Sequence, residues 1–471
     1  MLKERSKHFV MNIIIVGDGR VGDTLIQYIS GEGHSVTVID QNPALINRVV
    51  NEYDVMGVTG NGASQEIQIE AGVSDADLFI AVAGTDELNM VCCMMAKSLG
   101  AAHTIARVRD PDYSRERSFL RNHLGIDLVV NPEYDTAAEI ARLIRFPVAL
   151  KLDAFAKGQV DMAEIYISEG HPLAGRQLYT LSSLFGVRVL VCAIRRGDEV
   201  FIPSGDFTVK VGDSVSITAS HTDLSAFFGK LGLMGKPIKS VMLLGGGRIS
   251  YYLAERLAKL GIATRILEED EHRAAELAEL LPHARIVACN CTDSEILTDE
   301  GIGEMDACIA LTGNDEENVI VSMFARTQGV DRIITLVDRL SFIKMLPQIG
   351  MDCTVSPRQL SAATVLRYLR GLENGRKRDA ENASSIGIKS LYKLCEGRAE
   401  ALEFDVDDRF PLVGVQLMSP DFRLKPNTLI ASIVRDGQVI YPHGLSTLEV
   451  GDSVVVVTTN LQLTELGDIL A

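Results

Sequence analysis

The sequence predicts an α/β fold in which two Rossmann-like, doubly wound parallel sheets are each followed by a small α+β domain. Short, strongly apolar runs alternate with amphipathic stretches, which is typical of parallel strands connected by helices. A glycine-rich turn follows the first apolar run, and a close copy of it returns in the second half of the chain. The landmarks keep the same order in both halves, which indicates a tandem duplication of about 230 residues.

The spacing between equivalent landmarks measures this duplication. It is 228 residues at the glycine turn, 229 at an acidic segment and 239 near the end of each half. The matched segments are "IIIVGDGRVG" at 13–22 with "VMLLGGGRIS" at 241–250, "GTDELN" at 84–89 with "GNDEEN" at 313–318, "HPLAGRQL" at 171–178 with "FPLVGVQL" at 410–417, and "VGDSVSIT" at 211–218 with "VGDSVVVV" at 450–457. The later increase indicates extra residues, which fit the polar segment 375–387, and we expect that segment to be an exposed loop or linker.

Six apolar runs in the first 130 or so residues predict the strands of the first parallel sheet. They are "NIIIVG" at 12–17, "SVTVID" at 35–40, "DVMGVTG" at 54–60, "LFIAVAG" at 78–84, "TIARVRD" at 104–110 and "DLVVN" at 127–131. The runs are apolar throughout rather than alternating, as expected for strands covered by helices on both faces.

The last 80 residues of each repeat have a different pattern. Strand-like segments such as "AEIYI" at 163–167 and "GDSVSIT" at 212–218 surround turns such as "RRGDE" at 195–199, which predicts a small α+β domain. We therefore expect four domains, with residues 234–239 joining the two repeats and residues 1–10 forming an extension outside the fold. The expected domains are 11–135, 150–231, 239–360 and 389–471.

Composition limits the classes of function. The chain has 63 acidic and 46 basic residues, a formal charge of −17, which argues against nucleic acid as a partner. Eight scattered cysteines fit reduced thiols in a cytosolic protein, and "CNC" at 289–291 lacks a second ligand pair for a metal. No apolar run reaches the roughly 18 residues of a membrane span, and the charged N-terminal segment does not resemble a signal peptide.

The first glycine turn matches the dinucleotide-binding fingerprint. Gly17, Gly19 and Gly22 form G-x-G-x-x-G between a strand and a helix, and Asp40 ends the second strand 18 residues after Gly22. Gly17 permits the tight turn, Gly19 lets a pyrophosphate approach the backbone, and Gly22 lets helix and strand pack closely. The helix N-terminus offers N–H groups to phosphates, while Asp40 accepts from ribose hydroxyls and would repel a 2′-phosphate, which favours NAD over NADP.

The second turn is a weaker match. It keeps Gly245 and Gly247 but has Ser250 at the third position, and Glu268 stands where the first repeat has Asp40. Serine is small enough for close packing, and glutamate can reach the ribose with a longer side chain. A degenerate turn that has lost its ligand remains an alternative here, so we expect the first site to bind a dinucleotide better.

Loops after the other strands should complete each pocket, because ligands of such sheets bind at the carboxyl ends of the strands. The residues expected there are Gly60 and Asn61 with Cys289 and Asn290, Ala83 and Gly84 with Thr312 and Gly313, and Arg107. Leu336 replaces Arg107 in the second repeat, which makes the two sites chemically unequal. Arg20 and Arg248 share one turn position, where each could contact phosphate or be solvated.

The sequence shows no evident reaction centre. A dehydrogenase needs an acid or base beside the nicotinamide, but His171 becomes Phe410 in the second repeat, and neither a Ser-His-Asp nor a Lys-Tyr pattern stands out. We therefore expect a ligand-binding protein and not an enzyme. The alternatives are an NAD-dependent oxidoreductase with substrate bound between the repeats and, less favoured by the charge, a redox-sensing transcription factor.

The order "GxGxxG…D…GN…DExN", then "PLxGxxL…GxxxxP…VGDS", found twice over residues 11–471, resembles the TrkA family of tandem RCK (KTN) domain proteins. The resemblance implies that the small domains are of the RCK C-terminal type. It also implies nucleotide contacts from Gly17, Asp18, Gly19, Arg20, Val21, Asp40 and Arg107, and from the second-repeat residues Gly245, Gly246, Gly247, Arg248, Ile249 and Glu268. Residues 1–10, Ser250, Leu336 and the segment 375–387 depart from the family pattern.

The resemblance implies regulation of potassium uptake without chemical turnover. Its members bind NAD(H) and adenine nucleotides such as ATP and ADP. They assemble into a homo-oligomeric ring, for which we expect four chains, beneath a TrkH- or TrkG-type membrane subunit. We therefore expect a cytoplasmic protein, peripheral on the cytoplasmic face of the inner membrane, that gates potassium transport.

Overall fold

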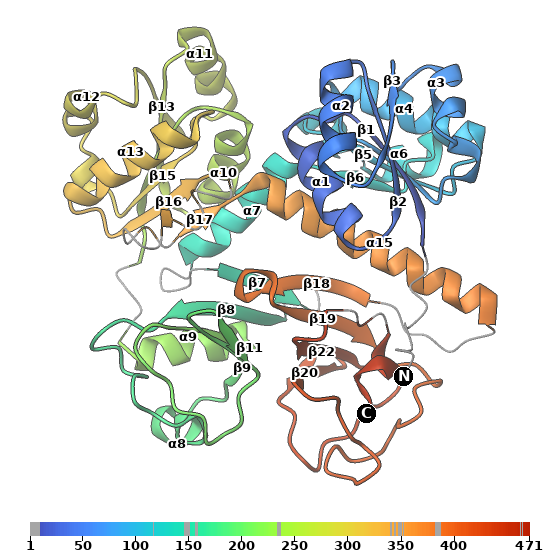
Figure 1. Cartoon of the computed structure of the whole chain (residues 1–471). Helices are drawn as coiled ribbons and strands as arrows, with labels where there is room; N and C mark the ends of the chain where they lie inside the picture. Colours follow the sequence, from blue (N-terminus) through green and yellow to red (C-terminus); the bar gives the residue numbers. More distant parts are fainter. Residues whose placement is uncertain are drawn as a thin grey trace. The chain divides into compact units, whose positions relative to one another are not determined.

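The structure is a computed structural model, and it divides into two compact units (Figure 1). It describes residues 10–115, 117–145, 151–155, 159–232, 237–339, 342, 345, 346, 351, 353–381, 388–461, 463 and 465–471. Unit 1 takes in Met1–Thr136 and Ser356–Leu369, and unit 2 takes in Ala137–Val355 and Arg370–Ala471. Residues 1–9 of the expected extension and 234–236 of the expected connection lie outside the described residues. Within the described ranges, none of the helices has the length and apolar character that a membrane span requires.

Unit 1 contains a six-stranded sheet in the order β3-β2-β1-β4-β5-β6, with every described pairing parallel. The strands are β1 (Asn12–Val16), β2 (Ser35–Asp40), β3 (Met56–Thr59), β4 (Leu78–Ala81), β5 (His103–Arg107) and β6 (Leu128–Val130). The central strand β1 is buried along Ile13–Val16, as its uninterrupted apolar run requires. This strand order confirms the expected doubly wound fold.

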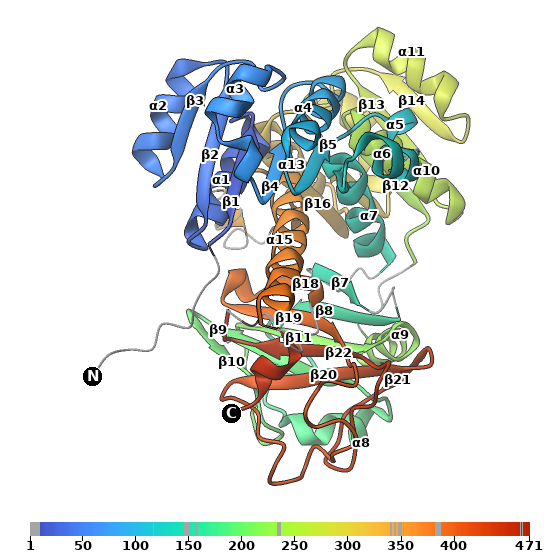
Figure 2. The same cartoon turned by 90° about the vertical axis from the view of Figure 1, so that its right-hand side faces the viewer.

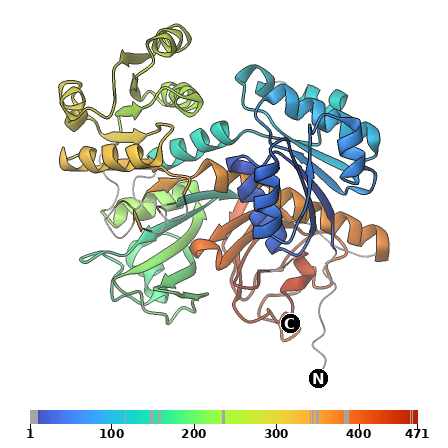
Figure 3. The ribbon, with the colours of Figure 1, turned by 45° about the horizontal axis from the view of Figure 1, so that its top comes forward.

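Helices cover the two faces of this sheet (Figures 1 and 3). They are α1 (Arg20–Gly31), α2 (Pro43–Glu52), α3 (Gln65–Glu70), α4 (Asp86–Leu99), α5 (Pro111–Arg115) and α6 (Arg117–Leu124); α7 (Pro132–Arg145) follows β6, but most of it belongs to unit 2. In α1 the buried residues Val21, Leu25 and Ile29 recur at helical spacing, so one face of the helix packs on the sheet.

Unit 2 repeats this architecture in a second parallel sheet, ordered β14-β13-β12-β15-β16-β17. Its strands are β12 (Ser240–Leu244), β13 (Ala263–Glu268), β14 (Ala284–Ala288), β15 (Ala307–Ala310), β16 (Arg332–Leu336) and β17 (Thr354–Val355). Its helices include α10 (Arg248–Lys259), α11 (Glu271–Leu280), α12 (Ser294–Asp299), α13 (Asp315–Thr327) and, from Arg370 onward, α15 (Pro357–Glu381). The shared strand order confirms the duplication of the Rossmann-like sheet.

Unit 2 also holds two five-stranded, antiparallel small sheets, ordered β10-β9-β11-β8-β7 and β18-β19-β22-β20-β21. The first has β7 (Lys151–Phe155), β8 (Val160–Tyr166), β9 (Leu190–Arg196), β10 (Glu199–Phe201) and β11 (Asp213–Ser220), with helices α8 (Leu181–Phe185) and α9 (His221–Lys230). The second has β18 (Ile388–Leu394), β19 (Ala399–Asp405), β20 (Thr428–Arg435), β21 (Gln438–Ile440) and β22 (Ser453–Thr458). The two sheets lie against each other (Figures 1 and 2). An apolar cluster between them contains Phe155, Cys192, Ala401 and Val455.

The helix that follows each Rossmann-like sheet belongs largely to the other unit. Helix α15 follows β17 of unit 2, but its residues up to Leu369 belong to unit 1, where Tyr368 Oη lies 3.3 Å from His103 Nδ1. Helix α7 follows β6 of unit 1, but its residues from Ala137 belong to unit 2, where the Leu143 carbonyl accepts from Arg332 Nη2 at 3.3 Å. The two repeats therefore exchange helices.

The expectation of a loop at 375–387 was wrong over its first half. Helix α15 continues through residues 375–381, while 382–387 lie outside the described residues. Pro357 at the first helical position starts the helix, and Arg, Lys, Ala and Glu in "GRKRDAE" are good helix formers that extend it. Polarity and flanking glycine therefore did not indicate a loop here.

Candidate functional site

The first glycine turn has the geometry that its three glycines require. Gly17 has a φ of +97°, and a Cβ there would lie 2.9 Å from the Ala83 backbone. A Cβ on Gly22 would lie 1.9 Å from the Gly17 carbonyl oxygen, so the helix approaches the turn more closely than any side chain allows. A Cβ on Gly19 would meet nothing within 4 Å, so this backbone faces open space.

Helix α1 begins at this open position. Gly19 is its N-cap, and no side chain within the described residues caps the helix through a hydrogen bond. The neighbouring helices α2 and α4 do have side-chain caps, from Asn42 and Thr85 respectively. The first N–H groups of α1 are therefore left for another acceptor, and the helix dipole favours an anionic one.

Asp40 ties the ends of β1, β2 and β3 together. Its Oδ2 accepts from the Asp18 N–H at 2.9 Å, and its Oδ1 accepts from the Asn42 N–H at 2.8 Å. The Gly60 N–H donates to the Asp40 carbonyl at 2.9 Å. A carboxylate has about four lone-pair sites, so Asp40 keeps acceptor capacity for hydroxyl groups of a ligand.

Arg48 on α2 contacts the first glycine turn, which the sequence did not predict. Its Nη2 donates to Asp18 Oδ2 and to Asp23 Oδ1, each at 2.9 Å. The side chain of Asp18 is fully buried, and this burial raises the pKa of its carboxyl group, against which the Arg48 hydrogen bond acts. Sequence reasoning missed Arg48, because nothing in its local spacing shows which loop the side chain reaches.

The loops after β4 and β5 are held together by two side chains of the "DELN" segment. Asn89 accepts from the Ala83 N–H at 2.7 Å and donates to the Arg107 carbonyl at 2.9 Å. Asp86 Oδ2 accepts from two successive N–H groups after β5, those of Arg109 and Asp110, each at 2.8 Å. The motif that revealed the repeat therefore fixes the shape of this part of the candidate site.

Arg107 lies at the end of β5, where the sequence placed it. Its Nη2 donates to the Ala83 carbonyl at 2.6 Å, so the guanidinium spans the β4 and β5 loops. Gly84 follows Ala83 on the surface, and its carbonyl accepts from Arg109 Nη2 at 2.6 Å.

The second glycine turn repeats the first with two changes. Gly245 has a φ of +106°, and a Cβ there would lie 2.8 Å from the Leu311 carbonyl oxygen. The Gly246 N–H donates to Glu268 Oε2 at 2.5 Å, as the Asp18 N–H does to Asp40. Ser250 is fully buried, and its hydroxyl donates to the Gly245 carbonyl, so a hydrogen bond replaces the close approach that Gly22 permits.

The remaining loops of the second site follow the same plan. The Cys289 N–H donates to the Glu268 carbonyl at 2.9 Å, and Asn290 Oδ1 accepts from the Thr292 N–H at 2.8 Å. Asn318 accepts from the Thr312 N–H at 2.8 Å and donates to the Leu336 carbonyl at 3.0 Å. Helix α10 begins at Gly247 and, within the described residues, has no side-chain cap.

The structure brings the expected residues of each site to one edge of its sheet. In unit 1 the residues at this edge are Gly17, Asp18, Gly19, Arg20, Val21, Asp40, Gly60, Asn61, Ala83, Gly84 and Arg107. In unit 2 they are Gly245, Gly246, Gly247, Arg248, Ile249, Glu268, Cys289, Asn290, Thr312 and Gly313. Within each set the side chains of Arg20 and Arg248 are exposed. An open glycine, an uncapped helix and an acid at one edge fit the diphosphate and ribose of a nucleotide.

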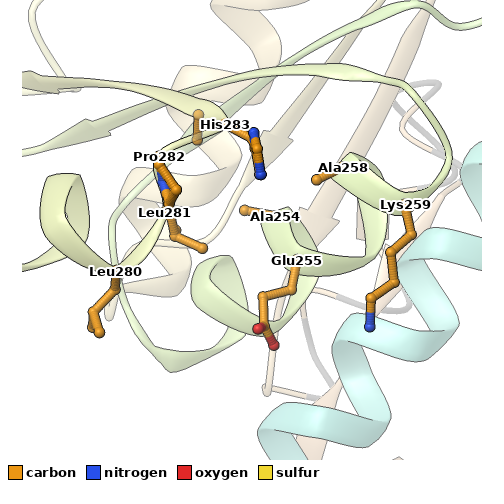
Figure 4. Close-up of a pocket in the computed structure, with 9 residues that line it drawn as sticks. Ala254, Glu255, Ala258, Lys259, Leu280, Leu281, Pro282 and His283 are labelled. Atoms are coloured by element: carbon orange, nitrogen blue, oxygen red, sulfur yellow. The ribbon is translucent and has the colours of Figure 1, made fainter.

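A separate pocket of about 400 Å³ lies at the opposite end of the second sheet (Figure 4). It is lined by the last turns of α10 and by residues leading into β14. His283 and Leu281 point toward Ala254 and Ala258, while Glu255 and Lys259 extend away. The glycine turn lies at the other end of α10, so this pocket is not part of the candidate site. Among the described residues no cluster of His, Cys, Asp and Glu could hold a metal ion.

Comparison with known proteins identifies the family. The TrkA-N domain matches residues 13–132 and 241–357, and the TrkA-C domain matches residues 162–232 and 402–471. The Trk system potassium uptake protein TrkA of Vibrio alginolyticus is 30% identical over 454 residues, which cover 96% of each chain. The chain belongs to the TrkA family. The TrkA homolog of Archaeoglobus fulgidus is 32% identical over 448 residues, covering 95% of this chain and 97% of the homolog.

Solved structures support the same fold for this TrkA-family chain. The GsuK RCK domain matches with a TM-score of 0.61 and 18% identity, covering 97% of this chain and 94% of that one. The GsuK channel bound to NAD matches with a TM-score of 0.62 and 18% identity, covering 97% of this chain and 78% of that one. The resemblance inferred from the repeated motifs is therefore confirmed.

Proposed function

We propose that this chain is the nucleotide-sensing regulatory subunit of a Trk-type potassium uptake system. The observation that carries the proposal is the pair of glycine turns, each opening on an uncapped helix and each followed by an acid that ends the next strand. The names of the TrkA relatives support the link to potassium uptake. The fold shared with a channel bound to NAD supports the link to nucleotides.

Each part of the first site has its own role toward a nucleotide. The N–H groups at the start of α1 bind phosphate oxygens, and Gly19 lets those oxygens come close to the backbone. Asp40 accepts from the ribose hydroxyls and holds the turn in position through the Asp18 N–H. Arg107 joins the β4 and β5 loops, where the group beyond the second phosphate distinguishes NAD(H) from ATP and ADP.

The chain senses nucleotides without transforming them. A bound nucleotide shifts the equilibrium between two shapes of the protein only if it binds one of them better. With a coupling of about 1–3 kcal/mol for each site, several sites acting together are sufficient to switch a transporter. The output is transmitted to a TrkH- or TrkG-type potassium-translocating subunit, on the cytoplasmic face of the inner membrane.

The chain assembles into a ring, for which four copies remain our expectation. Helices α4 and α13 each expose an apolar pair at equivalent positions, Val91 and Met94 in the first repeat and Ile320 and Met323 in the second. Between 41% and 63% of each side chain is exposed. A chain with the same apolar face on both of its repeats can contact one further copy on each side, which is what a closed ring requires.

A thermal-shift titration with NADH, NAD, ATP and ADP tests the nucleotide sites. A ligand that binds the native state raises the melting temperature, and the rise grows with the ratio of the free ligand concentration to Kd. We compare the wild type with Asp40→Asn and Glu268→Gln, which keep an acceptor for the turn N–H but remove the charge. Loss of the shift for one ligand in one variant assigns that ligand to that site. The absence of any shift in the wild type would contradict the proposal.

A turnover assay separates this function from that of an NAD-dependent oxidoreductase. NADH absorbance is followed with the purified chain and a panel of small carbonyl substrates. We expect no consumption of NADH beyond that in the protein-free control. Multiple turnovers at enzyme-like rates, of at least about 1 per second, would favour the oxidoreductase instead.

A further inference from the structure

The carboxylate of Asp18 has one oxygen that is paired and one that is not. Its Oδ2 accepts from Arg48 Nη2 at 2.9 Å. Its Oδ1 is buried and has no hydrogen-bond partner among the described residues. A buried acceptor without a donor is costly, so this oxygen is suited to a donor that a ligand brings to the turn.

Arg48 is connected through hydrogen bonds to Asp40, the acid that should bind the ribose. Arg48 contacts Asp18, whose N–H in turn contacts Asp40, so one residue separates the cation from Asp40. Its positive charge is already used, because Asp18 and Asp23 both accept from Nη2 and Glu52 lies 4.0 Å from Nη1. Three carboxylates therefore lie within 4.0 Å of this one arginine, while Asp40 is linked to it only through Asp18.

The second glycine turn lacks this arrangement. Gly246 stands where the first turn has Asp18, and a Cβ there would lie 2.6 Å from Leu277 Cδ1. Arg273 reaches the second turn from α11, and its Nε donates to the Gly246 carbonyl at 3.0 Å. The one carboxylate that pairs with it in the described residues is Glu276, at 2.7 Å. The two turns therefore differ in how strongly a nearby guanidinium is neutralised.

We propose that Asp18 makes the first turn selective for an adenosine ribose without a 2′-phosphate. This inference rests on the proposed nucleotide-binding function. A 2′-phosphate beside Asp40 needs a free arginine, and Asp18 withholds Arg48 from it while adding negative charge of its own. The unpaired Oδ1 of Asp18 accepts from a ribose hydroxyl, which a phosphorylated ribose cannot supply at that position.

NADH and NADPH differ only in the 2′-phosphate, so their relative affinity tests this proposal. Binding is measured by titration calorimetry on the full-length chain carrying Gly247→Ala, which weakens the second site. The variants are Asp18→Gly, which introduces the residue of the second turn, and Asp18→Gly combined with Arg48→Ala. Asp18→Asn, which keeps the shape of the side chain, replaces Asp18→Gly if melting curves show that the glycine variant is unfolded.

We expect the parent to prefer NADH by at least about tenfold. In Asp18→Gly, NADPH should gain about tenfold in affinity while NADH loses affinity, and removal of Arg48 should abolish the NADPH gain. If Asp18→Gly changed both affinities equally, or if the NADPH gain survived removal of Arg48, this inference would be wrong while the proposed function stood. A parent that bound neither ligand would overturn both.

Discussion

Substitution by alanine should affect different properties at Gly22 and at Gly19. At Gly22 it should lower stability, and at Gly19 it should lower nucleotide affinity. In Gly22→Ala the Cβ would start 1.9 Å from the Gly17 carbonyl oxygen, so helix and turn must separate by at least about 1 Å. Overpacking of this kind costs about 1–3 kcal/mol, and alanine recovers part of it through its better helix propensity. A net loss of about 1–2 kcal/mol should lower the melting temperature of a unit of this size, about 150 residues, by about 2–8 °C.

Gly19→Ala is the matched control for stability and the test for function. Its Cβ would meet nothing within 4 Å, and the φ of −74° suits alanine, so only the weaker N-cap is lost, at about 0.5 kcal/mol. The methyl group would instead occupy the space through which phosphate reaches the α1 N–H groups, so NADH affinity should fall at least about tenfold. Calorimetric melting and binding titrations measure both quantities. Wild-type affinity in Gly19→Ala, or wild-type stability in Gly22→Ala, would refute this account of the turn.

Three further predictions concern stability and assembly. Burial lowers the pKa of His171 below its ordinary value of 6.5, so acidification below about pH 6.5 should destabilise the fold. His171→Phe should flatten the dependence of the urea-unfolding free energy on pH. The same pH dependence in variant and wild type would contradict this. Met94→Glu or Met323→Glu places a charge on an exposed apolar face and should reduce the mass of the assembly in sedimentation, whereas an unchanged mass would remove these faces from the interface. Asp452 is buried and accepts from Arg435 at 2.7 and 2.8 Å, so Asp452→Ala should lose about 3 kcal/mol in urea unfolding, and a loss below about 1 kcal/mol would show that the pair is not structural.

The fold was predictable because its signals are local and repeated. The buried part of β1, Ile13–Val16, is an uninterrupted apolar run, and the turn after it has glycine where φ is positive. The same signals return in the second repeat, so each copy strengthens the prediction made from the other. The expectation for 375–387 was wrong over residues 375–381, because a polar, glycine-flanked sequence is also compatible with a helix, and α15 continues through these residues.

Only the site residues that directly follow a strand could be predicted from the sequence. Gly17, Asp40 and Arg107, for example, could be placed at one edge of the sheet, because the carboxyl ends of parallel strands meet there. Arg48 was not foreseen, since its role depends on how α2 packs beside α1. Asn89 was noticed only as a marker of the repeat, because its hydrogen bonds join two loops that are distant in sequence.

The exchange of α7 and α15 bears on how this protein could have arisen. A gene encoding one repeat would make a protein whose last Rossmann helix has no sheet of its own to rest on, so two copies would have to dimerise and swap those helices. Fusion of the two copies turns that encounter into an intramolecular one, independent of protein concentration. It also frees each half to diverge, and the two halves do differ, with Gly22 opposite Ser250 and Arg107 opposite Leu336.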